Sequence, residues 1–279
     1  MTRPRPVARL ARGTPASDGA GVKLNRVIGT ATLPAVDPFL MLDEFRSDDA
    51  ADYIAGFPDH PHRGFETVTY MLAGRMRHRD NKGHEGLLEA GSVQWMTAGR
   101  GIVHSEMPEQ ENGLMQGFQL WVNLPAKDKM TAPRYQEIPP RDIPVAELPG
   151  GVRVKVIAGA LGSVQGPING IAIEPVLLDV ALPAGARFAM PLPSGHNVFL
   201  YVFEGKAAVG GDGAAVPRGS IAVLGEGDGV ALAAPEGAAR VLLAAGRPLN
   251  EPVARYGPFV MNTEQQLREA VRDFQLGRL

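Results

Sequence analysis

The chain has 279 residues, which at about 150 residues per domain suggests two domains. It contains no cysteine, and this excludes disulfides, cysteine-based zinc sites, iron–sulfur clusters and thiol catalysis. Its 28 basic and 30 acidic residues nearly cancel. Because phosphate binding depends on clustered Lys and Arg, this balance argues against nucleic acid as a direct partner.

The first residues hold the one local cluster of positive charge, at Arg3, Arg5, Arg9 and Arg12. The segment lacks the apolar core of a secretory signal, and the chain has no run of about 18 apolar residues that could span a membrane. We expect an exposed start that leads into a first strand, with a transit peptide as the alternative interpretation. The abundance of Arg, Ala and Gly is typical of a GC-rich bacterial genome, so we expect a bacterial protein of the cytoplasm with no membrane partner.

Apolar and polar residues alternate along much of the chain. A strand-like run at 65–72 ends at Gly74, and alternation is strict at 118–124 and 152–156. A period of two indicates half-buried strands with one face on a core. Glycine- and proline-containing turns recur roughly every ten residues, a spacing typical of a sandwich or barrel. The sequence therefore predicts an all-β protein.

The chain divides near its middle at a proline-rich stretch without periodicity. We expect a linker at 135–148, an N-terminal domain at 1–134 and a C-terminal domain at 149–279. The two halves follow a similar order of strands and glycine turns, too weakly for the sequence alone to show a repeat.

One helix is expected, at 263–276. Thr263 and Gln266 have the spacing of a capping box, and Gly277 follows the last turn. Apolar residues recur at helical spacing at Leu267, Ala270, Val271 and Phe274. We interpret this stripe as core packing.

Two short motifs carry the candidate chemistry: His60-Pro61-His62 and His104-Ser105-Glu106. Side chains two residues apart on a strand point to the same face. If the two strands face each other inside a barrel, three imidazoles and one carboxylate converge, a set that suits a divalent transition metal. One such pair is common in proteins without metal. Two pairs in a chain with six histidines and no cysteine favour a metal site.

The other histidines are expected to have no ligand role. His78 and His84 lie in a polar, turn-rich stretch and are expected to be solvated, and His196 is expected to be structural. Dinucleotide-binding, phosphate-loop and nucleophile-elbow motifs are absent from the sequence.

Taken together, these motifs resemble the pirin family. The resemblance is carried by FPDHPHRGFETVTYMLAGRMRHRD, GSVQWMTAGRGIVHSEMP and GFQLWVNLP, and further by DPFLMLDEF, AVLGEGD and the segment 246–274. Pirins are bicupins, so the resemblance implies two β-barrel cupin domains that face each other, followed by the C-terminal helix. In this family only the N-terminal domain carries metal.

The resemblance implies that His60, His62, His104 and Glu106 are the metal ligands. Glu66, which the general cupin pattern would use, is expected to be a framework or outer-shell residue. The C-terminal half offers no matching ligands and is expected to bind no metal. Fe(II) is the expected ion, with Ni, Cu, Mn, Co and Zn as alternatives.

Two classes of function follow from the resemblance. Some pirins resemble quercetin 2,3-dioxygenases, which cleave a flavonol with O2 and release carbon monoxide. Others are non-enzymatic, metal- or redox-dependent regulators that bind a transcription factor or a metabolic enzyme. Under the enzyme hypothesis, Glu106 either stays a ligand or acts as the catalytic base that takes the 3-hydroxyl proton. The substrate cavity is expected near Phe57, Met71 and Gln119.

Overall fold

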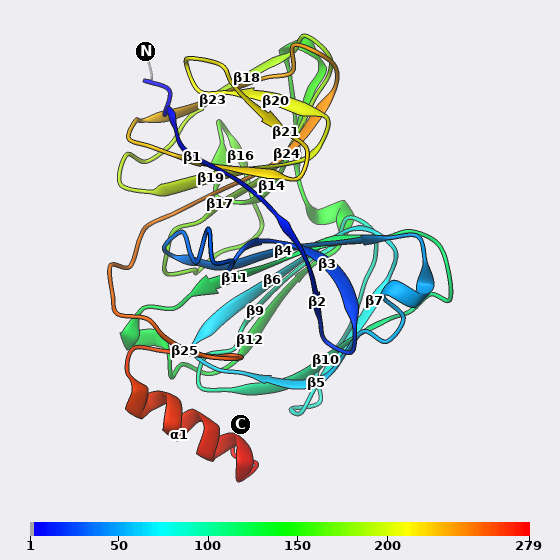
Figure 1. Cartoon of the computed structure of the whole chain (residues 1–279), viewed down its shortest axis with the longest axis vertical. Helices are drawn as coiled ribbons and strands as arrows, with labels where there is room; N and C mark the ends of the chain where they lie inside the picture. Colours follow the sequence, from blue (N-terminus) through cyan, green and yellow to red (C-terminus); the bar gives the residue numbers. More distant parts are fainter. Residues whose placement is uncertain (1–2) are drawn as a thin grey trace. The chain divides into compact units, whose positions relative to one another are not determined.

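A computed structural model describes residues 3–279 and divides them into two compact units (Figure 1). The first unit comprises residues 15–29, 39–140 and 249–279, and the second comprises residues 3–14, 30–38 and 141–248. Strands form most of both units, and one α-helix is present among the described residues. That helix is too short and too polar to cross a membrane.

The first unit contains a seven-stranded sheet in the order β12-β9-β6-β11-β4-β3-β2 and a four-stranded sheet in the order β5-β10-β7-β8. The larger sheet is made of β2 (Thr14–Asp18), β3 (Val22–Ile28), β4 (Phe39–Ser47), β6 (Phe65–Ala73), β9 (Val93–Thr97), β11 (Met115–Asn123) and β12 (Arg134–Ile138). The smaller sheet is made of β5 (Phe57–His62), β7 (Met76–Asp80), β8 (Glu85–Leu88) and β10 (Ile102–Pro108). The hairpin of β25 (Ala254–Tyr256) and β26 (Phe259–Met261) also belongs to this unit.

The second unit repeats this plan. Its seven-stranded sheet has the order β1-β22-β19-β24-β17-β14-β13, and its four-stranded sheet has the order β18-β23-β20-β21. The larger sheet is made of β1 (Val7–Arg12), β13 (Val145–Leu148), β14 (Val152–Ala158), β17 (Val176–Leu182), β19 (Asn197–Glu204), β22 (Ser220–Leu224) and β24 (Ala239–Gly246). The smaller sheet is made of β18 (Arg187–Pro191), β20 (Lys206–Val209), β21 (Ala214–Pro217) and β23 (Gly229–Ala233), and β15 (Ala160–Leu161) pairs with β16 (Val164–Gln165).

Alternation along each strand selects the side chains that enter each unit. On β14, Val152, Val154 and Val156 are fully buried and join one large apolar core of the second unit. On β10, the buried alternate residues include His104 and Glu106, so the same pattern carries polar groups into the first unit. The period-two pattern therefore sets the inner faces of both units.

The division of the chain departs from the expected domains 1–134 and 149–279 at both ends. The first strand, β1, pairs with β22 of the second unit, whereas the C-terminal segment 249–279 belongs to the first unit. Residues 135–148 are not a simple linker either, because they include most of β12 and all of β13, joined by a short 3-10 turn. Strands β1, β12 and β13 each lie at an edge of one of the two large sheets. Alternation of apolar and polar residues does not specify which edge a strand joins.

The C-terminal helix α1 (Glu264–Gln275) confirms the capping-box prediction. The Thr263 hydroxyl accepts from the Gln266 backbone N–H at 3.2 Å, and Gln266 Oε1 accepts from the Thr263 backbone N–H at 3.1 Å. The apolar stripe buries Leu267 and Ala270 in a cluster with residues of β26. These two residues are therefore core packing, as expected, whereas Phe274 at the end of the stripe is 41% exposed.

Candidate metal centre

Strands β5 and β10 bring the three predicted histidines together. The strands pair antiparallel, with His60 opposite His104 and His62 opposite Ile102. The ring centroids lie 4.5 Å apart for His60 and His104, 4.7 Å for His60 and His62, and 5.0 Å for His62 and His104. One nitrogen of each ring lies within 4.8 Å of the others. Three imidazoles this close can be drawn onto one ion at bonds of about 2 Å.

Neighbouring groups hold two of these rings in place. His60 Nδ1 lies 2.8 Å from the carbonyl oxygen of Pro58. Since a carbonyl only accepts, Nδ1 carries the proton and Nε2 keeps its lone pair for a metal. The His62 ring meets Phe65 and Trp121 edge to face, with centroids 5.1 and 5.4 Å away.

Burial keeps the inner two histidines neutral. It lowers the pKa of His62 well below its ordinary value, and the neighbouring histidines lower it further. Burial also lowers the pKa of His104 to about 4, more than the nearby Glu106 carboxylate raises it. The ring nitrogens of His104 make no hydrogen bond within residues 3–279, whereas His62 has a hydrogen-bond contact with the Pro258 backbone. Buried, neutral imidazoles fit a divalent transition metal.

Glu106 lies beside the imidazoles, but its carboxylate is not one of the atoms grouped within 4.8 Å. It accepts hydrogen bonds from Thr69 Oγ1 at 3.0 Å and from Gln119 Nε2 at 3.1 and 3.3 Å. Burial raises the pKa of Glu106, but His104, His60 and these hydrogen bonds outweigh burial, so the pKa lies below its usual range. The side chain is therefore an oriented, ionised carboxylate.

A cavity of about 570 Å³ opens beside His60 and His62. Phe57 and Gln119 line it, as expected, but Met71 does not. Met71 is fully buried in an apolar cluster with Met76, Leu88 and Met115. It shares an inner face with Thr69 but lies two residues farther along β6, where the interior is filled by apolar side chains.

Charged residues that the sequence did not single out line the same cavity. Arg26 binds Asp43 through two hydrogen bonds of 2.9 and 2.7 Å and also binds Asp18 at 2.7 Å. The guanidinium of Arg255 lies 4.7 Å from the centroid of the Trp121 ring. No local motif marks Arg255, because it reaches the cavity only through the return of β25 to the first unit.

Glu66 and His196, the two residues expected to have framework or structural roles, are both buried. Glu66 is buried and accepts a 2.6 Å hydrogen bond from Thr97 Oγ1, and it is not grouped with the three histidines. His196 is buried in the second unit, where its backbone N–H donates to the Pro193 carbonyl at 3.1 Å. Within residues 3–279, the groups of three or more His, Asp or Glu that could hold an ion all lie in the first unit.

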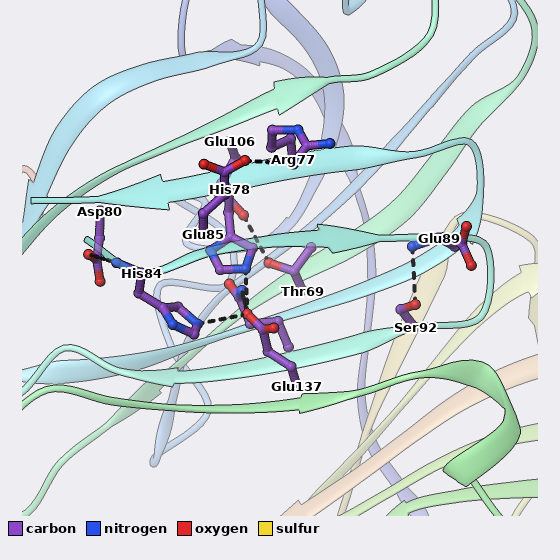
Figure 2. Close-up of polar contacts among 11 residues, drawn as sticks. Thr69, Arg77, His78, Asp80, His84, Glu85, Glu89, Ser92, Glu106 and Glu137 are labelled. Atoms are coloured by element: carbon purple, nitrogen blue, oxygen red, sulfur yellow. Dashed lines mark hydrogen bonds and ion pairs between the residues drawn. The ribbon is translucent and has the colours of Figure 1, made fainter. Parts of the chain in front are cut away.

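The expectation that His78 is solvated is wrong. His78 is fully buried on β7, where it pairs with Glu106 of β10. With His84 and Glu137 it forms a second group of potential ligand atoms within 4.8 Å (Figure 2). Met76 and His78 are buried and alternate with more exposed Arg residues, a strand pattern that the polar composition of the segment obscured.

Comparison with known proteins agrees with this architecture. Residues 21–122 match the family described as Pirin, and residues 177–279 match the Pirin C-terminal cupin domain. A pirin-like protein of Caulobacter vibrioides is 57% identical across 98% of this chain and 99% of its own. Mouse pirin is 44% identical across 93% of this chain and 88% of its own.

A solved structure of similar fold extends the comparison to three dimensions. The structure of quercetin 2,3-dioxygenase from Acinetobacter baumannii is 34% identical, with a TM-score of 0.90 across 100% of this chain and 98% of its own. Both units are thus cupin-type domains, and the protein is a bicupin. With relatives this similar along nearly its full length, the chain belongs to the pirin family.

Proposed function

We propose that this protein is a metal-dependent dioxygenase that cleaves flavonol-like substrates in the manner of quercetin 2,3-dioxygenase. The observation that carries the proposal is the cluster of three imidazoles, two of them buried and neutral, at the wall of a cavity of about 570 Å³. Pockets for small molecules are commonly about 300–1,000 Å³, so a cavity of this volume is large enough for a three-ring flavonol. The named activity of the similar Acinetobacter baumannii protein supports the same class of reaction.

His60, His62 and His104 would hold the metal, and we propose Fe(II) as the ion and Glu106 as the fourth ligand or the base. A divalent ion in this place would lower the pKa of a bound flavonol hydroxyl and allow reaction with O2. The protein's own contribution is orientation and proton transfer. Thr69 and Gln119 hold the ionised Glu106 carboxylate, which can accept the proton of the flavonol 3-hydroxyl.

The cavity walls favour a flat aromatic molecule. Phe57 and Trp121 contribute aromatic side chains to the lining, and Arg26 and Arg255 contribute donors for phenolic oxygens. Asp18 and Asp43 neutralise much of the charge of Arg26, so the cavity suits a polar neutral or weakly acidic substrate.

The test is aerobic turnover of quercetin by protein reconstituted with Fe(II), with carbon monoxide release and O2 uptake as the readouts. The wild-type protein and His196→Ala are expected to turn over substrate, whereas His104→Ala is expected to have no detectable activity. Wild-type protein that holds one iron per chain but releases no carbon monoxide would overturn the proposal.

A matched pair of variants tests the role of Glu106. Glu106→Gln keeps the size and the hydrogen-bonding ability of the side chain but cannot take a proton at neutral pH. Glu66→Gln makes the same change in a buried carboxylate that is not grouped with the histidines. We expect kcat to fall on the order of 100-fold or more in Glu106→Gln and to stay near wild type in Glu66→Gln. Equal effects in the two variants would remove Glu106 from the reaction.

A further inference from the structure

A second group of ligand-type side chains lies in the first unit, outside the cluster of His60, His62 and His104. His78 comes from β7, His84 from the turn that precedes β8, and Glu137 from β12. The first two belong to the four-stranded sheet side of the unit and the third to the seven-stranded sheet. Figure 2 shows both imidazoles directed at the Glu137 carboxylate.

The contacts of this group meet at one oxygen atom. His84 Nε2 lies 3.1 Å from Glu137 Oε1, His78 Nε2 touches the same oxygen, and Gln94 Nε2 donates to it at 3.0 Å. Burial raises the pKa of Glu137, but contacts with His78, Gln94 and His84 lower it to about 2, so the carboxylate is ionised. The three ligand-type side chains together offer two imidazole nitrogens and one carboxylate.

Neighbouring residues hold the imidazoles in this arrangement. Tyr135 stacks on His84 with ring centroids 4.3 Å apart and on His78 with centroids 5.5 Å apart. The His84 backbone N–H donates to Asp80 Oδ1 at 2.9 Å, which fixes the turn. The side chains are thus positioned by a ring stack and a turn, and do not depend on their mutual contacts alone.

Two observations distinguish this group from an ordinary buried ion pair. His78 is fully buried, with its Nε2 on the Glu137 carboxylate, and its Nδ1 makes no hydrogen bond within residues 3–279. In addition, residue 86 is a glycine whose missing side chain leaves space at the ligand atoms. A Cβ atom there would collide with His78 Nε2 and would lie 2.7 and 2.8 Å from the Glu137 carboxylate oxygens.

We propose that His78, His84 and Glu137 form a second binding site for a divalent transition metal, with zinc as the ion that suits it best. Two histidines and one carboxylate, with further positions open to water, are an established ligand set for zinc and for related ions. The side chains of Glu137 and His84 are 31% and 41% exposed, so the ion can enter from solvent while His78 anchors it inside.

The second ion would join the β7–β8 hairpin to β12. All three ligand-type residues belong to the first unit, as do the three clustered histidines. On the paired strands β7 and β10, His78 is the register partner of Glu106.

The experiment counts metal equivalents in the full-length protein. Chelator-treated protein is loaded with Zn(II) alone, freed of excess ion in the presence of a weak competing chelator, and measured by elemental analysis. We expect His84→Ala to bind one equivalent fewer than wild type, and Leu87→Ala, a change at an exposed position of β8, to bind as many as wild type. Equal stoichiometry in wild type and His84→Ala would overturn the proposal.

Gly86→Ala provides a test that keeps all three ligands. The added methyl group fills the space between His78 and Glu137, so this variant is also expected to lose one equivalent. Co(II) loading gives an independent readout, since the visible absorption bands of one site should disappear in both variants. Retention of every equivalent and of both sets of bands in Gly86→Ala would overturn the site. The count of ions does not depend on quercetin turnover, so the dioxygenase proposal can fail without affecting it.

Discussion

The strand pair β5–β10 of the first unit and the strand pair β18–β23 of the second occupy the same places in the same sheet order. In the first unit, this pair brings His60 opposite His104. In the second unit, it brings Phe188 opposite Leu232, and both residues belong to the large apolar core. One backbone plan therefore supports a candidate metal centre in one unit and a packed hydrocarbon interior in the other.

The difference extends beyond this strand pair. Among the buried polar and charged residues of the described chain, those in the second unit are Arg5, Asp179, His196 and Ser220, and all others lie in the first unit. Burial of apolar side chains stabilises the second unit directly. The first unit has to offset the desolvation of its polar interior with hydrogen bonds and, as proposed, with bound ions. The fold itself does not determine the function, which depends on the side chains placed on it.

The largest expected effect comes from removing an inner imidazole. His62→Ala should weaken binding of the proposed Fe(II) more than about 100-fold, since even outer partners of metal ligands contribute 10–100-fold. Elemental analysis after chelator treatment and reloading measures this loss. His196→Ala makes the same change at a buried histidine of the second unit and should retain full iron content. Stoichiometric iron in His62→Ala would remove this residue from the site.

A second prediction uses the pH dependence of the metal-free protein. Burial lowers the pKa of His104 to about 4, below the ordinary value of 6.5. As the pH falls from 6.5 to 4, His104 takes up a proton in the unfolded chain before it does so in the folded protein. The stability that the neutral His104 contributes above pH 6.5 is therefore lost toward pH 4. The expected loss is about 3 kcal/mol of unfolding free energy.

His104→Leu gives this position the kind of side chain that Leu232 provides in the second unit. Denaturant unfolding at pH 7 and pH 4 should show a loss of stability that is smaller in this variant by about 3 kcal/mol. The same loss in variant and wild type would mean that folding does not lower the pKa of His104.

Local patterns predicted the parts of the fold and site that depend on near neighbours. The i, i+2 spacing within residues 60–62 and within 104–106 predicted that three histidines converge, and they do because β5 and β10 pair directly. The capping box likewise predicted α1. The group of His78, His84 and Glu137 was missed because Glu137 comes from a different sheet, more than fifty residues from His84. The packing of the two sheets brings these residues together, and no local sequence pattern predicts that contact.

A third, smaller effect is expected from the support of Glu106. Gln119→Leu removes the donor that reaches both Glu106 oxygens, and metal affinity should fall 10–100-fold. Gln116→Leu is the matched control on the same strand, where Gln116 donates to a different carboxylate, that of Glu44, at 3.3 Å. Competition titration with a chromophoric chelator measures both affinities. Similar losses in the two variants would indicate a general effect of disturbing β11.

The smallest expected effect tests the assignment of the C-terminal helix to the first unit. Thr263→Ala removes the N-cap hydroxyl that accepts from the Gln266 backbone N–H and should cost about 1 kcal/mol. Because α1 packs on β26, native-state hydrogen exchange should speed up at the amides of α1 and β26 and stay unchanged at β19 of the second unit. Thr263→Ser keeps the hydroxyl and should exchange like wild type. Faster exchange at β19 in Thr263→Ala would show that the helix stabilises both units. The polar first unit and the apolar second unit could then not be treated as independently stable.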